Sequence, residues 1–250
     1  MSVAVVTGAS RGLGLALAVE LAGRGFDLVL GARGAGELER AAARVERLGV
    51  RAVPVSGDVA SAEHRSALVE AARELGGLDL LVNNAGVLGA EPLVPLAEQP
   101  LAGFRAALEV NLVGPLGLYQ AAAPLLRGSP AGAVLNVSSA AAVVPYATWG
   151  AYGATKAGLD LLSGVLAVEE PGLRVWWVDP GSMRTRMMAA AEPGEDLSGL
   201  PAPEEVAAVL GRLVAERPPS GRYTAAGLVG PAAGDVPPVG GSGAAVRAGR

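Results

Sequence analysis

The chain has 250 residues, of which 51% are hydrophobic and 18% charged, and its formal net charge is −4. This length and composition exclude disorder as the main state, and the interspersed charges exclude a nucleic-acid tract or an anionic-membrane surface. Cysteine is absent and histidine occurs once, at His64, so disulfides, thiol catalysis and a zinc site of several imidazoles are excluded. We expect His64 to be solvated, because it lies in a polar run that opens a predicted helix.

The N-terminus enters a strand-like apolar run at residues 3–6 without the basic segment of a signal peptide. The uncharged stretch 132–155 contains polar side chains, a proline and three glycines, which does not fit a membrane span. The sequence therefore predicts a cytoplasmic protein with no membrane or nucleic-acid partner.

Lysine occurs once, at Lys156, and asparagine four times, whereas arginine is abundant. Two explanations are open: a GC-rich genome, or selection against heat-labile amides in a thermophile. In both cases arginine has replaced lysine wherever a generic positive charge suffices. We expect the remaining lysine to have a specific local role, the alternative being survival by chance.

Short apolar blocks alternate with longer blocks of helical periodicity along the chain. This alternation predicts an α/β fold: a single-domain, doubly wound, Rossmann-type sheet of about seven parallel strands with helices on both faces. Two smaller domains are the less favoured alternative. The strands are expected at residues 3–7, 26–32, 52–56, 78–83, 133–137 and 173–179, and the helices at 13–24, 37–48, 62–75, 101–126, 151–169 and 203–215.

No repeat or linker divides residues 1–230, which we expect to form one domain. Within it, the irregular segment 184–200 follows the sixth strand and is predicted to be a mobile substrate lid. Residues 231–250 are rich in glycine, proline and alanine, and we expect a poorly ordered tail there.

A glycine-rich turn joins the first strand to the first helix, with the sequence Thr-Gly-Ala-Ser-Arg-Gly-Leu-Gly at residues 7–14. Glycines there let backbone N–H groups approach a pyrophosphate, and the helix N-terminus favours its charge. The spacing differs from the common G-x-G-x-x-G, and such turns can be purely structural. The strand–turn–helix context favours a dinucleotide site.

The end of the second strand distinguishes NADP from NAD. It lacks the acid that usually accepts from the ribose hydroxyls, and Arg33 stands there instead. Arg33, with Arg11 from the turn, suits a 2′-phosphate, so we predict NADP(H) over NAD(H); the alternative is that both are solvated surface charges. Asp58 after the third strand either accepts from the adenine amino group or caps the next helix.

Tyr152 and Lys156 stand four residues apart at the start of a predicted helix and share one face. A nearby cation favours the phenolate and lowers a tyrosine pKa, which makes the phenol a workable acid and base. Ser139 precedes Tyr152 by 13 residues and lies at the end of the fifth strand, where ligands gather in this fold. The alternative is an ordinary surface pair.

Together these motifs resemble the short-chain dehydrogenase/reductase family, in its compact branch of about 250 residues. The resemblance covers about 70% of the chain, from Thr7 to Thr185, and rests on the order and spacing of motifs that are individually modest. The motifs are the glycine turn, Asp58-Val59, Asn83-Asn84-Ala85-Gly86, Asn111 in Glu-Val-Asn-Leu, Ser139, Tyr152-x3-Lys156, and Asp179-Pro180-Gly181 through Thr185.

The resemblance implies that Tyr152 is the proton donor and acceptor, and that Ser139 binds the substrate oxygen. It implies that Lys156 holds the nicotinamide ribose, and that Asn111 holds a water that relays protons. No metal is implied. The cofactor-binding residues implied are Gly8, Ser10, Arg11, Gly12, Leu13, Gly14, Arg33, Asp58, Val59, Asn84, Ala85, Gly86, Tyr152, Lys156, Pro180, Gly181, Met183 and Thr185.

The 13-residue interval selects Ser139 over Ser138, and Tyr146 lacks a lysine four residues on, so we expect Tyr146 to line the pocket or pack. Specificity is expected to come from loops 88–96, 143–150 and 184–200, whose apolar residues weakly favour an apolar pocket. Those residues are Pro145, Tyr146, Trp149, Met187 and Met188.

The sequence thus predicts an NADP(H)-dependent carbonyl reductase or alcohol dehydrogenase acting on a small molecule. One alternative is a regulator that binds NADP(H) without chemistry, and another is an epimerase or eliminating enzyme, against which the short chain argues. We expect a homodimer or homotetramer. Helices 101–126 and 151–169 are apolar enough for a dimer contact, although their alanine-rich faces fit an intrachain core equally well.

Overall fold

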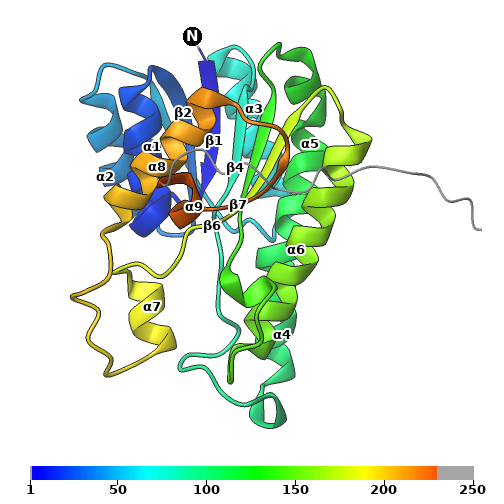
Figure 1. Ribbon diagram of the computed structural model, residues 1–250. Helices are drawn as coiled ribbons and strands as arrows, with labels where there is room; N and C mark the ends of the chain where they lie inside the picture. Colours follow the sequence, from blue (N-terminus) through cyan, green and yellow to red (C-terminus); the bar gives the residue numbers. More distant parts are fainter. Residues whose placement is uncertain (1, 230–250) are drawn as a thin grey trace, which may run out of the picture.

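A seven-stranded parallel sheet forms the centre of the computed structural model, which describes residues 2–229 (Figure 1). The strand order is β3-β2-β1-β4-β5-β6-β7, and every neighbouring pair is parallel. This confirms the predicted doubly wound fold; the predicted tail at residues 231–250 lies outside the described residues. The strands are β1 (Ser2–Thr7), β2 (Phe26–Ala32), β3 (Ala52–Ser56), β4 (Leu80–Asn83), β5 (Ala133–Val137), β6 (Arg174–Asp179) and β7 (Gly221–Thr224).

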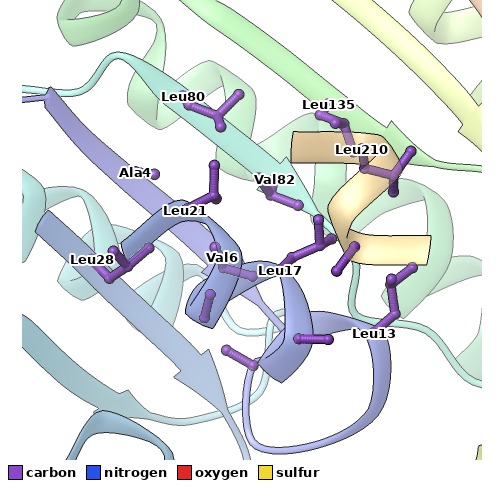
Figure 2. Close-up of a cluster of buried hydrophobic side chains, with 14 of the residues drawn as sticks. Ala4, Val6, Leu13, Leu17, Leu21, Leu28, Leu80, Val82, Leu135 and Leu210 are labelled. Atoms are coloured by element: carbon purple, nitrogen blue, oxygen red, sulfur yellow. The ribbon is translucent and has the colours of Figure 1, made fainter. Parts of the chain in front are cut away.

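Helices cover both faces of this sheet. On one face α1 (Gly12–Gly23), α2 (Ala35–Glu46) and α8 (Pro203–Glu216) pack over the strands, and Figure 2 shows the apolar side chains between α1, α8 and the sheet. On the other face lie α3 (Ala62–Leu75) and α5 (Gly114–Gly128). The chain thus has three layers, with the sheet in the middle.

The alternation of side chains along β1 explains why this strand is apolar throughout. Ala4 and Val6 point into the α1 and α8 layer, whereas Val3 and Val5 point into the α3 and α5 layer. All four are at most 2% exposed. Burying one such valine contributes about 1.5–3 kcal/mol, so both layers stabilise the strand that carries the glycine turn.

The predicted helix 101–126 is interrupted. It consists of α4 (Leu101–Leu108), a π-helical turn (Glu109–Val113) and α5. Asn111 lies in the π-helical turn and is fully buried, with hydrogen bonds to the backbone of Val87. Such turns are frequent at functional sites, because the extra residue re-aims a side chain.

The segment 184–200, predicted to be irregular, contains the short helix α7 (Arg186–Ala191). Thr185 caps it by accepting a hydrogen bond from the Met188 N–H over 3.2 Å, which explains the helical turn. The remaining elements are η1 (Leu96–Glu98), η3 (Ala140–Ala142), α6 (Gly150–Glu169) and α9 (Ala225–Val229). Between residues 2 and 229, none of the helices combines the length and apolar character required to cross a bilayer.

The expectation that His64 is solvated is wrong: its exposed fraction is 7%. The first turn of α3 points the ring at the ends of β2 and β3, where a β-carbon on Gly57 would lie 2.4 Å from Nδ1. Burial lowers the pKa of His64, so the ring is neutral at pH 7 and packs as part of the core.

Candidate active site

A cleft of about 650 Å³ opens at the carboxyl edge of the sheet. The glycine turn, the end of β5, the start of α6 and the segment after β6 line it. Figure 1 shows α7 and the lower ends of α4 and α6 at this end of the molecule, on opposite sides. A cleft of this size and position is typical of a ligand site in a doubly wound fold.

Tyr152 and Lys156 lie one turn apart on α6 and are both buried, with exposed fractions of 8% and 2%. The Lys156 ammonium donates to the Val137 carbonyl oxygen over 2.7 Å and lies 5.6 Å from the centre of the Tyr152 ring. Gly153 lets α6 pack closely against the segment after β5, because a β-carbon on Gly153 would be 2.7 Å from the Ala141 carbonyl oxygen. The ordinary surface pair is therefore excluded as an alternative.

Burial determines the titration of these two groups. It raises the pKa of the Tyr152 phenol, as does the Asp179 carboxylate, while a hydrogen bond with Ser139 lowers it. The predicted lowering of this pKa is wrong for this structure, because desolvation of the phenolate outweighs the hydrogen bond with Ser139. Burial also lowers the pKa of Lys156 to about 8, although Asp160 opposes that shift. At neutral pH the phenol therefore holds its proton and the lysine is mostly charged.

Asn111 and Lys156 both approach Gly86 on the side where a β-carbon would lie. A β-carbon on Gly86 would be 3.4 Å from Asn111 Oδ1 and 3.9 Å from Lys156 Nζ. The Asn111 amide donates to the Val87 carbonyl and the Thr155 hydroxyl, each over 2.9 Å, and accepts from the Val87 N–H over 2.9 Å. These bonds fix the chain after β4 against α6; the water relay through Asn111 stays a prediction.

The glycine turn fits a pyrophosphate. Gly8 and Gly12 have φ values of +68° and +56°, which favour glycine, and a β-carbon on Gly14 would lie 2.3 Å from the Gly8 carbonyl oxygen. The first turn of α1 contains no acidic residue, so its N–H groups and dipole favour an anion. Asn84 holds the loop after β4 to the turn, donating to the Thr7 carbonyl over 2.8 Å.

The ends of β1, β2 and β3 lie side by side, held by hydrogen bonds from Ala9 N–H to the Gly31 carbonyl (3.1 Å) and from Gly57 N–H to the Ala32 carbonyl (3.0 Å). Arg33 is exposed at this edge. The alternative that Asp58 caps α3 is wrong, because Ser61 accepts from the His64 N–H in that role.

Sequence reasoning missed two charged residues beside the turn, Glu37 and Arg186. The Glu37 carboxylate pairs with Arg11 at 3.2 Å and with Arg186, from α7, at 3.5 Å. Its place in the first turn of α2, just after Arg33, could have indicated Glu37. No local signal could have indicated Arg186, which lies 149 residues from its partner.

Most of the predicted site residues line the cleft, and Ser10, Arg33, Asp58, Val59, Ala85 and Asn111 are not among its lining residues. Of the residues predicted to form an apolar pocket, Tyr146, Trp149, Met187 and Met188 line the cleft and Pro145 does not; Trp149 lies edge-on to Tyr152. The predicted residues in the lining are Gly8, Arg11, Gly12, Leu13, Gly14, Asn84, Gly86, Ser139, Tyr152, Lys156, Pro180, Gly181, Met183 and Thr185.

The sequence is also similar to those of known proteins. The family model described as short chain dehydrogenase matches residues 2–196. The chain is 38% identical over 230 residues to cis-4-hydroxycyclohexanecarboxylate dehydrogenase of Sinomonas cyclohexanicum, which covers 86% of this chain and 89% of the relative. It is 33% identical to 3beta-hydroxysteroid dehydrogenase 1 of Eggerthella lenta, covering 85% of this chain and 86% of the relative.

Among solved structures, the alcohol dehydrogenase of the archaeon Thermococcus sibiricus in complex with 5-hydroxy-NADP superposes with a TM-score of 0.82 at 28% identity. The match covers 90% of this chain and 95% of that one. The family-model match spans well over half of the sequence, and the relatives align over most of their length. The chain therefore belongs to the short-chain dehydrogenase family of oxidoreductases.

Proposed function

We propose that this protein is an NADP(H)-dependent oxidoreductase that interconverts a carbonyl and a secondary alcohol, with Tyr152 as its acid and base. The observation that carries the proposal is the burial of Tyr152 and Lys156 together in the cleft that the glycine turn lines. A regulator that only binds the dinucleotide needs the turn but no buried phenol and ammonium.

A dinucleotide held at the glycine turn would supply or accept the hydride. Tyr152 donates its phenolic proton to the carbonyl oxygen during reduction and removes a proton from the alcohol during oxidation. The Ser139 hydroxyl hydrogen-bonds that same oxygen, and the charge of Lys156 stabilises the phenolate as it forms. The backbone of Asn84, Ala85 and Gly86 would help to hold the cofactor.

The raised pKa of Tyr152 sets the expected pH dependence. Reduction uses the protonated phenol, which is the form present at neutral pH, and also the charge of Lys156. It should therefore decline as the pH rises through the Lys156 pKa of about 8 and be lost as the pH approaches the Tyr152 pKa. Oxidation uses the phenolate and therefore increases with pH. Rate measurements in both directions from neutral to alkaline pH test this; an oxidation rate that falls with pH would contradict the role of Tyr152 as a base.

Two arginines support the preference for NADP(H). Arg33 is exposed at the end of β2, and Arg11 belongs to the glycine turn. A guanidinium suits a phosphate ester, and neither position offers a carboxylate for ribose hydroxyls. The alcohol dehydrogenase of Thermococcus sibiricus, which shares the fold, is complexed with an NADP derivative.

The substrate class follows from the apolar wall of the cleft. Trp149, Tyr146 and Met187 offer aromatic and thioether surface beside Tyr152. Two relatives are named for ring alcohols, a hydroxycyclohexanecarboxylate and a hydroxysteroid. We therefore expect the cleft to take a cyclic ketone or ring alcohol in preference to a linear one.

A second copy of the chain is the expected partner. Leu161, Val165 and Val168 of α6 are 71%, 44% and 64% exposed, and Leu116 of α5 is 40% exposed. These side chains are not part of the intrachain core, so burial against an identical surface would stabilise them. Light scattering with size-exclusion chromatography tests for a dimer or tetramer, and Leu161→Glu should shift it toward monomer.

The decisive experiment is a panel of carbonyl compounds, followed by the loss of NADPH absorbance. We expect turnover of cyclic ketones with NADPH, and slower turnover with NADH. No turnover of any carbonyl or alcohol, while NADPH still binds, would leave the non-catalytic alternative. Equal catalytic efficiency with NADPH and NADH would contradict the proposed contact between Arg33 and the 2′-phosphate.

A further inference from the structure

The last two residues of β5 and the two that follow it, residues 136–139, are each held by a side-chain hydrogen bond. Each of these residues bonds a different polar side chain, and three of the four partners lie on α6. Asn136 donates to Ser163 over 2.7 Å, the Val137 carbonyl accepts from Lys156 over 2.7 Å, the Ser138 hydroxyl donates to Asp160, and the Ser139 carbonyl accepts from Arg222 over 3.1 Å.

Asp160 and Arg222 also bond each other. Arg222 Nε donates to Asp160 Oδ2 over 2.9 Å, and the Asp160 and Arg222 side chains are only 11% and 24% exposed, respectively. Asp160 lies one turn beyond Lys156 on the same face of α6, whereas Arg222 comes from β7 at the edge of the sheet. A desolvated ion pair contributes little net stability. Its effect here is geometric, because each partner also holds one of the last two residues of this chain segment.

We propose that Asp160 and Arg222 are a positioning pair, which fixes the Ser139 hydroxyl against Tyr152 and gives the Lys156 ammonium an anionic neighbour. The first half rests on the proposed function. The second half concerns charge in the resting protein and can be tested without any substrate.

The electrostatic half depends on the titratable groups around Lys156. On its own helix these are the neutral Tyr152 phenol and the Asp160 carboxylate. Asp179 of β6 acts on Tyr152, and Arg222 of β7 offsets Asp160. Asp160 opposes the burial that lowers the pKa of Lys156. Removing the Asp160 charge should therefore lower that pKa further, whereas removing its counter-charge should raise it.

Lys156 is the only lysine of the chain, so a single resonance reports its titration in protein labelled with ¹³Cε-lysine. The wild type should titrate near pH 8. We expect the midpoint to fall in Asp160→Asn and to rise in Arg222→Gln. Opposite shifts distinguish electrostatics from general loosening, which would move both midpoints the same way. Unchanged midpoints in both variants would overturn this half.

Kinetics test the geometric half. Both variants should lower kcat by about ten- to a hundredfold, the range expected when a reacting group is displaced by up to an ångström, with unchanged NADPH affinity. Arg222→Lys keeps the positive charge with fewer hydrogen-bond donors and should recover part of the rate. It is restricted to the kinetic test, because it adds a second lysine to the chain. Wild-type kcat in Asp160→Asn and Arg222→Gln would refute the positioning role.

A matched control is Glu170→Gln. Glu170 is 15% exposed and pairs with Arg127 at the far end of α6, away from the cleft. The Glu170→Gln variant should have a lower melting temperature, with kcat and the Lys156 titration unaltered. If Asp160→Asn does not fold, Arg222→Gln carries both tests. If the wild type turns over no carbonyl compound, the proposed function fails, while the titration still decides the charge relationship.

Discussion

The two sides of the cleft are held together by different interactions. On the side that carries Tyr152 and Lys156, called the catalytic side after their proposed role, Asn111 and Thr155 are fully buried, and two hydrogen bonds between β5 and α6 are each 2.7 Å long. On the side of the glycine turn, called the phosphate side after its proposed ligand, Arg11, Glu37 and Arg186 have side chains that are 54%, 36% and 76% exposed, and their ion pairs are 3.2 and 3.5 Å long.

This difference predicts what each side does. Buried hydrogen bonds leave a desolvated group without a partner when broken, so they fix geometry. Exposed ion pairs are screened by salt and exchange partners easily, contributing about 0–1 kcal/mol each. Substitutions on the catalytic side should therefore change chemistry and stability, and substitutions on the phosphate side should change cofactor affinity.

The largest expected effect is that of Tyr152→Phe. The variant keeps the ring and its edge-on contact with Trp149, but it has no proton to donate. We expect kcat to fall by about a hundred- to ten-thousandfold, the usual contribution of a general acid, with NADPH affinity unchanged. Steady-state rates and a fluorescence titration with NADPH measure the two quantities. Full activity would refute the acid/base assignment and remove the contrast between the two sides.

The next effect concerns stability. Ser163 accepts from Asn136 and donates to the Leu159 carbonyl over 2.6 Å, all of it buried. Ser163→Ala leaves the Asn136 amide without this partner, which should lower the free energy of unfolding by about 1–3 kcal/mol. Urea denaturation measures this change in the free energy of unfolding.

Ser66 on α3 provides the control for that variant. Its hydroxyl makes the same bond, to the Ala62 carbonyl four residues back, but it is exposed. Ser66→Ala should change the free energy of unfolding by no more than about 0.5 kcal/mol. Equal losses for Ser163→Ala and Ser66→Ala would show that burial does not distinguish the two sites.

The sequence predicted most of the fold and most of the cleft lining because both follow from local patterns. Buried parallel strands are apolar on both faces, so their positions can be read from runs such as residues 3–7, and the carboxyl ends of those strands meet at one edge. Glycine spacing and the four-residue interval between Tyr152 and Lys156 are equally local. Those motifs therefore point to the correct end of the sheet.

What the sequence did not predict depends on contacts between distant segments. The interruption at Asn111 follows from its bonds to Val87, and the inward position of His64 follows from the absence of a side chain at Gly57. Asp160 could have been noticed at helical spacing from Lys156, but its partner Arg222 is 62 residues away in sequence, on another element. The raised pKa of Tyr152 likewise depends on burial, which periodicity does not quantify.

On the phosphate side, Arg33→Ala should raise the KM for NADPH by about tenfold, as expected for the loss of one partly solvated bond to a charged group. The KM for NADH should stay nearly constant, because that cofactor has no 2′-phosphate. Arg40→Ala, an exposed arginine on α2, is the control and should change neither value. Parallel increases for both cofactors with Arg33→Ala would indicate a structural role instead.

The smallest effect should come from Glu37→Gln, and its sign is the informative part. The Glu37 carboxylate pairs with Arg11 and Arg186, so a phosphate that binds Arg11 has to compete with it. Removing that charge should tighten NADPH binding by about two- to fivefold, the range set by exposed ion pairs, and leave NADH binding unchanged. Added salt should narrow the difference in NADPH affinity between wild type and variant, because screening weakens the competing ion pair.

Glu39→Gln, on the same helix and exposed, provides the control. Weaker NADPH binding in Glu37→Gln would mean that the carboxylate holds the arginines in place for the phosphate, and the phosphate side would then resemble the catalytic side.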